Sequence, residues 1–545
     1  MLAHTVILRC GRRTLSRWIQ RHPKTTSVSP SPQEGLQEER WHYVPPELQA
    51  VITEGRPLSQ TDWEQLKSVS VGYKNITERN FPGFVMRVCA AQSKFAVGKS
   101  LLNTLEKWNT PPGIGTLSKF MRLCGTSLED CGEDVILATY DKIKRMTDVF
   151  DEGTLEDMII ALCETSQWTE SIKLLKVMEN QNLASGRPNL LSHIAIAAFK
   201  RGNHNLGWEM VVKIHELGLE HRPSETVFDT WLDLCNEHVR LGDESSQDQA
   251  CNMFWRMMHY IRDYQYYPSV TLVQRITDCF NAINKISTSA VLTTISRGSR
   301  VCQNCGEVLP AYKFDENEFL SLRSAFMEKV ITGNDVFMKT SPFELRQFRE
   351  MVTMAAPFDL VIDGLNILYR ISNSHKKSSG LNQLASIVQF YAEDLKKKVL
   401  VMGRHHMRRK DSAALKYIKK RSLLFTTESL SQDDPFLIYA ALSSGPECFI
   451  LSCDMLRDHT ARIHDHSLKR LFLKWLHCRR MEFHGLNSSG KPIIQAPILH
   501  AVQLHEHQHG YHLPYNDGSV KSFLSVPETW ICTHVPSKSS LLYKK

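Results

Sequence analysis

The chain has 545 residues, of which 42% are hydrophobic, and a formal net charge of +8. This length predicts two or three domains rather than one, with enough apolar residues for each to form a core. The mild basic excess is compatible with a nucleic-acid partner without identifying one. No apolar run reaches the length of about 18 residues that a membrane-spanning helix needs, so no membrane span is expected.

The N-terminal segment is basic and contains no acidic residue before Glu34. Its arginines, its frequent Ser and Thr, and apolar residues that could share one helix face are typical of a mitochondrial transit peptide. A disordered basic arm is the alternative. We therefore assign residues 1–45 to a transit peptide and linker and expect a location in the mitochondrial matrix. Most of the 14 cysteines should then be free thiols or metal ligands.

Residues 60–290 are predicted to be helical and partly repetitive. Residues 155–175 resemble residues 191–212, with Ala161 aligned to Ala197, and a third copy begins near Thr226. Helical hairpins that repeat in this way stack into a solenoid. A period of about 34 residues is typical of tetratricopeptide repeats. A slightly longer period is typical of pentatricopeptide repeats, which bind RNA. The period alone does not distinguish the two.

Residues 357–484 are predicted to form a Rossmann-like α/β domain. Candidate strands at 358–362, 398–402, 422–426 and 448–452 alternate with candidate helices at 381–396, 411–420, 433–443 and 467–477. This alternation is typical of a parallel sheet. The first strand is followed by Asp363-Gly-Leu-Asn366 instead of a G-x-G-x-x-G loop, which argues against a dinucleotide cofactor.

Four aspartates occupy strand ends and a helix start in this domain: Asp363, Asp433, Asp434 and Asp454. The carboxyl ends of parallel strands share one edge of the sheet, where ligands bind. Carboxylates gathered there would repel one another without a cation, and their hard oxygens suit Mg²⁺ or Mn²⁺. A metal-dependent nuclease fits this arrangement best. Asp is also a common helix N-cap, which is the structural alternative for any single residue, although one cap does not need the pair Asp433–Asp434.

A basic run between residues 396 and 421 borders these aspartates. Such a run is often only a solvated surface. Beside an acidic metal site, however, it suits an enzyme that holds a phosphate backbone. The candidate RNA contacts are Arg404, Arg408, Arg409 and Lys410.

Cys302 and Cys305 form a C-x₂-C pair, which is half of a tetrahedral zinc site. A redox pair is the alternative. The C-terminal part supplies Cys532 and several histidines that could complete the site, namely His505, His507, His509, His512 and His534. Spacing does not choose among these histidines. Such a site would join residues 291–356 to residues 485–545 as one zinc-bearing central domain.

The chain resembles the protein-only ribonuclease P family, closest to its animal mitochondrial members. The resemblance rests on VIDGLN at 361–366, GRHHMRR at 403–409, SQDDPFLIYA at 431–440 and CDMLRDH at 453–459. The C-x₂-C pair, YHLP at 511–514 and WIC at 530–532 also match, so that the resemblance covers roughly residues 60 to 535. It implies a pentatricopeptide-repeat domain, a zinc-bearing central domain and an NYN/PIN-type metallonuclease domain.

The resemblance also implies a function and its residues. The activity is removal of the 5′ leader from precursor tRNA. The catalytic metal ligands are Asp363, Asp433, Asp434 and Asp454, with a supporting role for Asp458 and His459, and the zinc ligands are Cys302, Cys305, His512 and Cys532. Animal members need a tRNA methyltransferase and a short-chain dehydrogenase as partners.

The expected chemistry is Mg²⁺-dependent hydrolysis in which water attacks the scissile phosphorus, leaving a 5′-phosphate on the tRNA and a 3′-hydroxyl on the leader. Two alternatives are open. One is a different PIN-like endoribonuclease that acts in RNA turnover. The other is a non-catalytic RNA-binding repeat protein.

Overall fold

The structure is a computed structural model that describes residues 44–534 except 182, 184–186, 219–220, 285–289, 313, 327–341, 370–379, 409–411, 428–433, 457–459, 461–462, 464, 508–509 and 521–524. The predicted transit peptide and the site residues Arg409, Lys410, Asp433, Asp458 and His459 therefore lie outside the described residues. The chain divides into two compact units, one helical and one built around two sheets.

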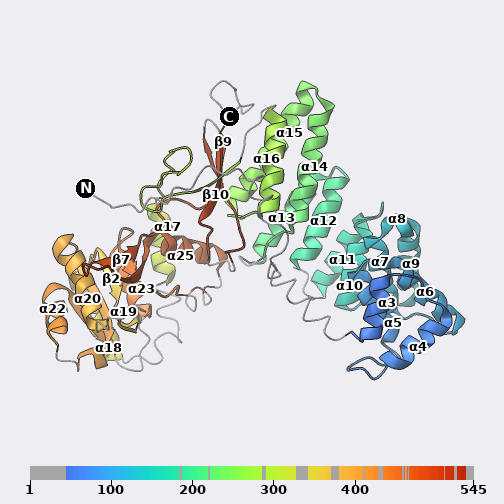
Figure 1. The fold of residues 1–545 in the computed structure, drawn as a ribbon, viewed down its shortest axis with the longest axis horizontal. Coiled ribbons are helices and arrows are strands. Elements are labelled where there is room, and N and C mark those ends of the chain that lie inside the picture. The colour runs from blue at the N-terminus through green and yellow to red at the C-terminus, as the bar shows by residue number, and fades with distance from the viewer. Residues whose placement is uncertain are drawn as a thin grey trace. The chain divides into compact units, whose positions relative to one another are not determined.

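The helical unit consists of successive α-helices (Figure 1). Its helices are α3 (Pro46–Glu54), α4 (Gln60–Ser70), α5 (Phe81–Ala91), α6 (Phe95–Lys107), α7 (Ile114–Thr126), α8 (Leu128–Cys131), α9 (Glu133–Met146), α10 (Glu152–Leu162), α11 (Thr169–Asn180), α12 (Pro188–Lys200), α13 (His204–Glu216), α14 (Glu225–Leu241), α15 (Glu244–Asp263) and α16 (Val270–Asn284).

The predicted repeats are hairpins of two helices. The pair α10–α11 is followed by α12–α13 and then by α14–α15, and the first helices of successive hairpins pack against one another. At α12–α13 the packing is close, because a Cβ at Gly207 would overlap the Phe199 ring. Phe199 in turn packs on Trp231 of α14, with ring centroids 4.7 Å apart. Aromatic contacts of this kind join one hairpin to the next, as a solenoid requires.

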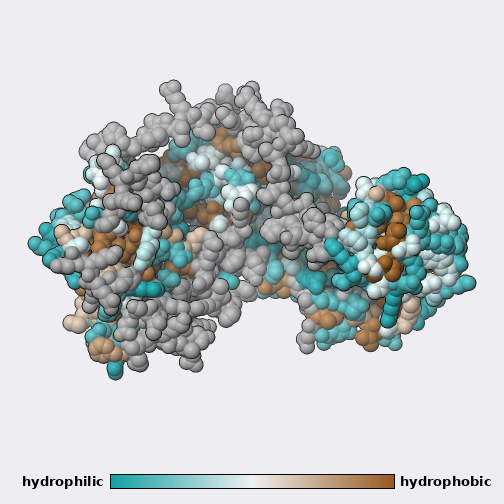
Figure 2. Space-filling model, turned by 60° about the horizontal axis from the view of Figure 1, so that its bottom comes forward, coloured by the Kyte–Doolittle hydropathy of each residue, from teal (hydrophilic) through white to brown (hydrophobic). Residues whose placement is uncertain are grey.

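The surface of the protein is mixed in character. On the face drawn in Figure 2, hydrophobic patches lie between hydrophilic areas. In the helical unit the exposed large apolar side chains include Val135, Met146 and Val149. Among the described residues, no helix combines the length and the apolar composition needed to cross a membrane.

The second unit contains two sheets. The smaller is antiparallel, with the order β1-β10-β9-β8. Its strands are β1 (Val291–Thr294), β8 (His505–His507), β9 (Gly510–Pro514) and β10 (Thr529–His534). Strand β1 therefore pairs with a strand from the C-terminal end of the chain, and the two flanks of the intervening α/β domain meet in this one sheet.

The larger sheet has six strands in the order β4-β3-β2-β5-β6-β7. The strands are β2 (Leu360–Asp363), β3 (Val399–Arg404), β4 (Leu423–Thr427), β5 (Phe449–Leu451), β6 (Arg480–Leu486) and β7 (Pro492–Gln495). All neighbouring strands are parallel except the β6–β7 pair. The four predicted strands match β2 to β5. The β6–β7 hairpin was not predicted, and it carries the sheet beyond residue 484.

Helices cover both faces of this sheet. They are α17 (Glu316–Ala325), α18 (Pro342–Ala355), α19 (Gly364–Tyr369), α20 (Gly380–Val388) with a π-helical continuation (Gln389–Asp394), α21 (His405–Arg408), α22 (Ala413–Arg421), α23 (Asp434–Ser443) and α25 (His466–Arg479). Successive strand residues point to opposite faces. Accordingly Val361 packs with Phe436 and Trp475 on one face, while Ile362 packs with Leu384 on the other. The core is thus the three-layer α/β arrangement that the sequence predicts.

The strand order places a crevice beside β2. From β2 the chain moves to β3 and β4 on one side, and then returns to β5 on the other side of β2. At such a reversal the connections leave the sheet in opposite directions and open a crevice at the carboxyl ends of the two strands. Asp363 ends β2 and Asp454 follows β5, so both lie at this edge.

Candidate metal centres

Three cysteines and one histidine meet beside the small sheet, and two of the four lie on its strands β9 and β10. The side-chain ligand atoms of Cys302, Cys305, His512 and Cys532 all lie within 4.8 Å of one another. The Cys305 Sγ and the His512 Nε2 are 3.2 Å apart. Three sulfurs and one imidazole nitrogen at such spacing match a tetrahedral zinc site, whose Zn–S distance of about 2.3 Å sets the ligands this far from each other.

Strand register explains half of this cluster. His512 in β9 lies directly opposite Cys532 in β10, and residues that face each other across an antiparallel pair have neighbouring side chains. The other half comes from a tight turn, in which the Gly306 N–H donates to the Cys302 carbonyl at 3.0 Å. Gly306 has a φ of +78°, a conformation that glycine adopts without strain.

The surroundings of the cluster also suit a metal. The Asn304 Nδ2 donates to the Cys532 Sγ at 3.3 Å. The hydrogen bond between the Cys302 and Cys532 thiols lowers the pKa of Cys302 and raises the pKa of Cys532, so it favours a thiolate at Cys302, the form in which cysteine binds a metal. Among the described histidines, His505 instead contacts the carbonyl of Ala501 at 2.7 Å. The geometry therefore selects His512, the residue that the family resemblance implied and that spacing alone did not.

The described aspartates of the predicted catalytic site lie at the edge of the large sheet. Asp363 is the last residue of β2 and is only 5% exposed. Asp434 is the first residue of α23, and Asp454 follows β5. Among the described residues, these carboxylates do not form a cluster as tight as the cysteine–histidine set. Water molecules, which Mg²⁺ commonly keeps as ligands, would fit such wider spacing.

Two residues that the sequence did not single out orient Asp363. The Asn366 side chain donates to the Asp363 Oδ2 at 2.8 Å, and the Asn366 backbone N–H donates to Oδ1 at 3.1 Å. The buried Ser452 hydroxyl also donates to Oδ2 at 2.8 Å and accepts from the Asp454 N–H at 3.1 Å. Ser452 therefore connects the ends of β2 and β5. The position of Asn366, three residues after Asp363, was a signal that sequence reasoning could have used.

Local capping accounts for part of this geometry. The Asp363 Oδ1 accepts a backbone N–H in the first turn of α19, and the Asp454 Oδ1 accepts from the Leu456 N–H at 2.9 Å. Capping does not require burial, however. Burial is the main cause that raises the pKa of Asp363 to about 6, with a smaller contribution from the charge of Asp434. A buried carboxylate near a second one is stabilised by a cation, so the donor set fits a divalent metal.

The predicted basic contacts are only partly described. Arg404 ends β3, the neighbour of β2, and so lies at the same sheet edge as Asp363. Arg408 ends α21, and nothing is described of its side chain. Elsewhere in the basic run, Lys397 and Arg421 form ion pairs with Asp359 and Glu393. Part of the run is therefore ordinary charged surface, the alternative that the sequence left open.

Comparison with known proteins agrees with this geometry. The sequence profile of the family described as protein-only RNase P matches residues 297–532. The chain is 27% identical over 484 residues to the mitochondrial ribonuclease P catalytic subunit of Rattus norvegicus, covering 88% of this chain and 78% of that protein. Residues 297–532 thus match the protein-only RNase P family, and mitochondrial ribonuclease P catalytic subunits are similar to the chain over most of its length.

More distant members of the protein-only RNase P family are also similar. Proteinaceous RNase P 1, chloroplastic/mitochondrial, of Arabidopsis thaliana is 26% identical over 246 residues, which cover 43% of this chain and 39% of that protein. The crystal structure of nuclear proteinaceous RNase P 2 from the same plant superposes with a TM-score of 0.57 at 15% identity, over 84% of this chain and 100% of that chain. At this identity the structural likeness concerns the fold. The profile match spans the cysteine–histidine cluster and all four aspartates of the candidate catalytic site.

The raised pKa of Asp363 leads to a prediction about stability. A carboxyl group with a raised pKa holds its proton more tightly in the folded state, so its contribution to stability is complete below about pH 4 and is lost as the pH rises through about 6. Without Mg²⁺, the stability of Asp363→Asn relative to the parent should therefore be greater at pH 7.5 than at pH 4, by up to about 3 kcal/mol. Thermal unfolding of the two proteins measures the difference.

The same experiment has an internal control. The gap should shrink at pH 5.5, where the parent carboxyl is largely protonated. Added Mg²⁺ should raise the unfolding temperature of the parent and not that of Asp363→Asn. A stability difference that is the same at pH 7.5 and pH 5.5 would show that the Asp363 carboxyl does not titrate in this range.

Proposed function

We propose that this chain is the endonuclease that removes the 5′ leader from mitochondrial precursor tRNAs. The observation that carries the proposal is the reversal of strand order at β2 and β5, because Asp363 ends β2 and Asp454 follows β5, and such a reversal opens a crevice at the strand ends. A buried, oriented carboxylate in a sheet-edge crevice is suited to hold a catalytic cation. The relatives named as mitochondrial ribonuclease P catalytic subunits supply the substrate class.

We assign Asp363, Asp433, Asp434 and Asp454 to the catalytic Mg²⁺ (or Mn²⁺). When bound, the cation supplies a lowered pKa for the attacking water and neutralises charge on the phosphate. The chain's own contribution is orientation: Asn366 and Ser452 fix the Asp363 carboxylate, and Asp454 is fixed by its bond to Leu456. The products are a 5′-phosphate on the tRNA and a 3′-hydroxyl on the leader.

We assign a structural Zn²⁺ to Cys302, Cys305, His512 and Cys532. Its role is to hold residues 291–356 and 485–545 together around the nuclease domain, which we predicted at residues 357–484 and whose sheet extends to Gln495. The helical residues 60–290 form the RNA-binding repeat domain. Because the relatives carry mitochondrial names, we place this chain in the mitochondrion, in the matrix, with a methyltransferase and a short-chain dehydrogenase as partner subunits.

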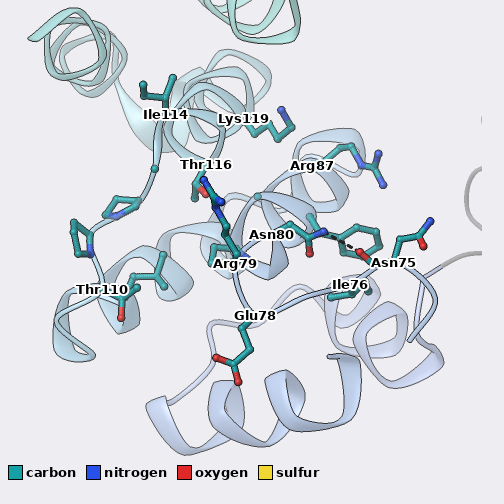
Figure 3. Close-up of a pocket in the computed structure, with 18 of the residues that line it drawn as sticks. Asn75, Ile76, Glu78, Arg79, Asn80, Arg87, Thr110, Ile114, Thr116 and Lys119 are labelled. Atoms are coloured by element: carbon teal, nitrogen blue, oxygen red, sulfur yellow. Dashed lines mark hydrogen bonds between the residues drawn. The ribbon is translucent and has the colours of Figure 1, made fainter. Parts of the chain in front are cut away.

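A basic cavity in the helical unit supports the RNA-binding role. Its volume is about 1190 Å³, and its lining includes Lys74, Arg79, Arg87 and Lys119 but only one acid, Glu78. Figure 3 shows Arg79, Arg87 and Lys119 around it, contributed by the α4–α5 loop, α5 and α7. The aromatic residues Tyr73 and Phe84 also line the cavity. Cations beside aromatic rings suit phosphates and unstacked bases.

This role predicts a binding defect without a chemical defect. The double variant Arg79→Met/Arg87→Met should weaken precursor tRNA binding and lower the salt dependence of log K by about two, because two cations no longer neutralise RNA phosphates. Cleavage at saturating protein should stay near the parent rate. The matched control is Lys142→Met/Lys176→Met, which removes two exposed cations from α9 and α11. Equal binding by the cavity variant and the control would exclude the cavity from RNA recognition.

A substrate panel tests the function against its alternatives. The chain, together with the partner subunits, should cut a precursor tRNA once, at the 5′ end of the mature tRNA. It should leave an unstructured RNA of the same leader sequence uncut. Cleavage of the unstructured RNA would favour an endonuclease of RNA turnover. Tight binding without any cleavage would favour a non-catalytic repeat protein.

A further inference from the structure

A small cavity lies beside Asp454, between the nuclease sheet and the segments that flank it. Its volume is about 170 Å³. It is lined by Arg297, Met455, Leu476, His477, Arg480, Ile498, Ser525 and Val526. Met455 is the residue after Asp454 and Arg480 begins β6, the neighbour of β5. The cavity therefore adjoins the proposed catalytic edge of the sheet without including any of its carboxylates.

Arg480 ties the cavity to that edge. Its Nη1 donates to the Ser452 carbonyl at 3.2 Å, and Ser452 is the residue whose hydroxyl orients Asp363. The side chain is 20% exposed, and Glu482 is 3.7 Å away. Burial lowers the pKa of Arg480, and the nearby Glu482 carboxylate opposes this effect more strongly than the charge of Arg297 adds to it. Arg480 and Arg297 thus line the same cavity, and Arg480 also contacts the residue that orients Asp363.

Arg297 approaches the cavity from the segment after β1. Its Nη1 donates to the Ala496 carbonyl at 3.3 Å, and its Nη2 pairs with the exposed Glu528. Each guanidinium already has one carboxylate partner, Glu482 at 3.7 Å for Arg480 and the exposed Glu528 for Arg297, and both guanidiniums also line the same cavity. The planar N–H groups of arginine match the oxygens of a phosphate.

We propose that Arg297 and Arg480 bind a backbone phosphate of the RNA adjoining the scissile one. This inference rests on the proposed function, because it places the substrate strand across the β2–β5 crevice. The carboxylates at the crevice repel RNA phosphates. The two arginines, in contrast, attract the RNA phosphate next to the scissile one. They act as positioning residues: they hold the RNA so that the scissile phosphate lies at the aspartates.

The test couples substitutions in the protein to substitutions in the RNA. Precursor tRNAs are made with one neutral methylphosphonate at each position flanking the scissile bond. When the parent protein cleaves these RNAs, the methylphosphonate at one position should reduce kcat/KM by about tenfold or more. This is the effect of losing a hydrogen bond to a charged group. Arg480→Met and Arg297→Met should each cause a similar loss on the all-phosphate RNA. On the RNA with a methylphosphonate at the sensitive position, the arginine variants should have nearly the same kcat/KM as the parent, because this RNA already lacks the charge that the arginines bind.

Controls separate positioning from folding. Arg297→Lys keeps the charge and should keep most of the methylphosphonate effect, while Lys491→Met removes an exposed cation from the β6–β7 turn and should behave as the parent. If Arg480 only supports the Ser452 carbonyl, the losses from protein and RNA substitutions will multiply at every position, which overturns the proposal. The same conclusion follows if Arg297→Met, on a different segment, cleaves every RNA like the parent. A parent that cleaves no precursor at all would instead reject the proposed function itself, together with this inference.

Discussion

Replacing Asp454 with Asn is expected to abolish most cleavage while leaving the fold and RNA binding intact. Asn keeps the size of the side chain and can still accept the Leu456 N–H, so the local turn should survive. It loses the negative charge that a divalent cation requires. Single-turnover cleavage of precursor tRNA should fall by more than about a hundredfold. The loss of a residue that only supports a metal ligand already costs a metal site up to about that much.

A matched substitution shows whether this loss is specific. Asp465 caps α25, where its side chain accepts the Leu468 N–H at 2.9 Å, so Asp465→Asn makes the same chemical change at a purely structural cap. That variant should cleave near the parent rate. Combining Asp454→Asn with Asp363→Asn should add little to the loss, because residues that act as a unit are not additive. Near-parent cleavage by well-folded Asp454→Asn would remove Asp454 from the catalytic site.

The second large effect is expected at the cysteine–histidine cluster. Cys532→Ser should release the bound zinc and lower the thermal stability of the protein, since the binding free energy of a structural zinc is part of the folding free energy. The cluster joins β1, β9 and β10 with the turn at residues 302–306. Its loss should therefore free both flanks of the nuclease domain at once. Metal analysis and thermal unfolding are the two measurements.

Cys448→Ser is the control for this prediction. Cys448 is also buried, at 2% exposure, but it lies in the core of the large sheet and not at the cluster. Its substitution should leave the zinc content at one per chain. Absence of stoichiometric zinc from the purified parent, or retention of zinc by Cys532→Ser, would contradict the assignment of the site.

Much of the nuclease fold could be predicted because its strands are short, apolar and buried on both faces. The runs ending at Ile362 and Leu451 are of this kind, and each is followed by Asp within a few residues. The β6–β7 hairpin lacked this signal. Strand β7 is a short edge strand that begins with Pro492 and is only partly buried, so its sequence has neither a long apolar run nor clear alternation.

The site was less predictable than the fold because contacts across strands decide it. Nothing in the spacing of the C-terminal histidines shows that His512 faces Cys532, since that depends on the register of β9 and β10. Ser452 was missed for a similar reason. It is a lone serine at a strand end, and its importance follows from the pairing of β2 with β5, which brings its hydroxyl to Asp363. The candidate metal-binding aspartates were easier, because charged residues after buried strands are conspicuous in the sequence itself.

The most direct test of the account is to identify the product ends after single-turnover cleavage of a precursor tRNA. The reaction contains the chain, its proposed partner subunits and Mg²⁺, and a parallel reaction omits Mg²⁺. Attack by water that is held at a carboxylate-bound metal predicts one cut, a 5′-phosphate on the tRNA, a 3′-hydroxyl on the leader, and no cleavage when Mg²⁺ is omitted. A 2′,3′-cyclic phosphate on the leader, or equal cleavage without Mg²⁺, would show that the chemistry does not depend on these aspartates and would contradict the account.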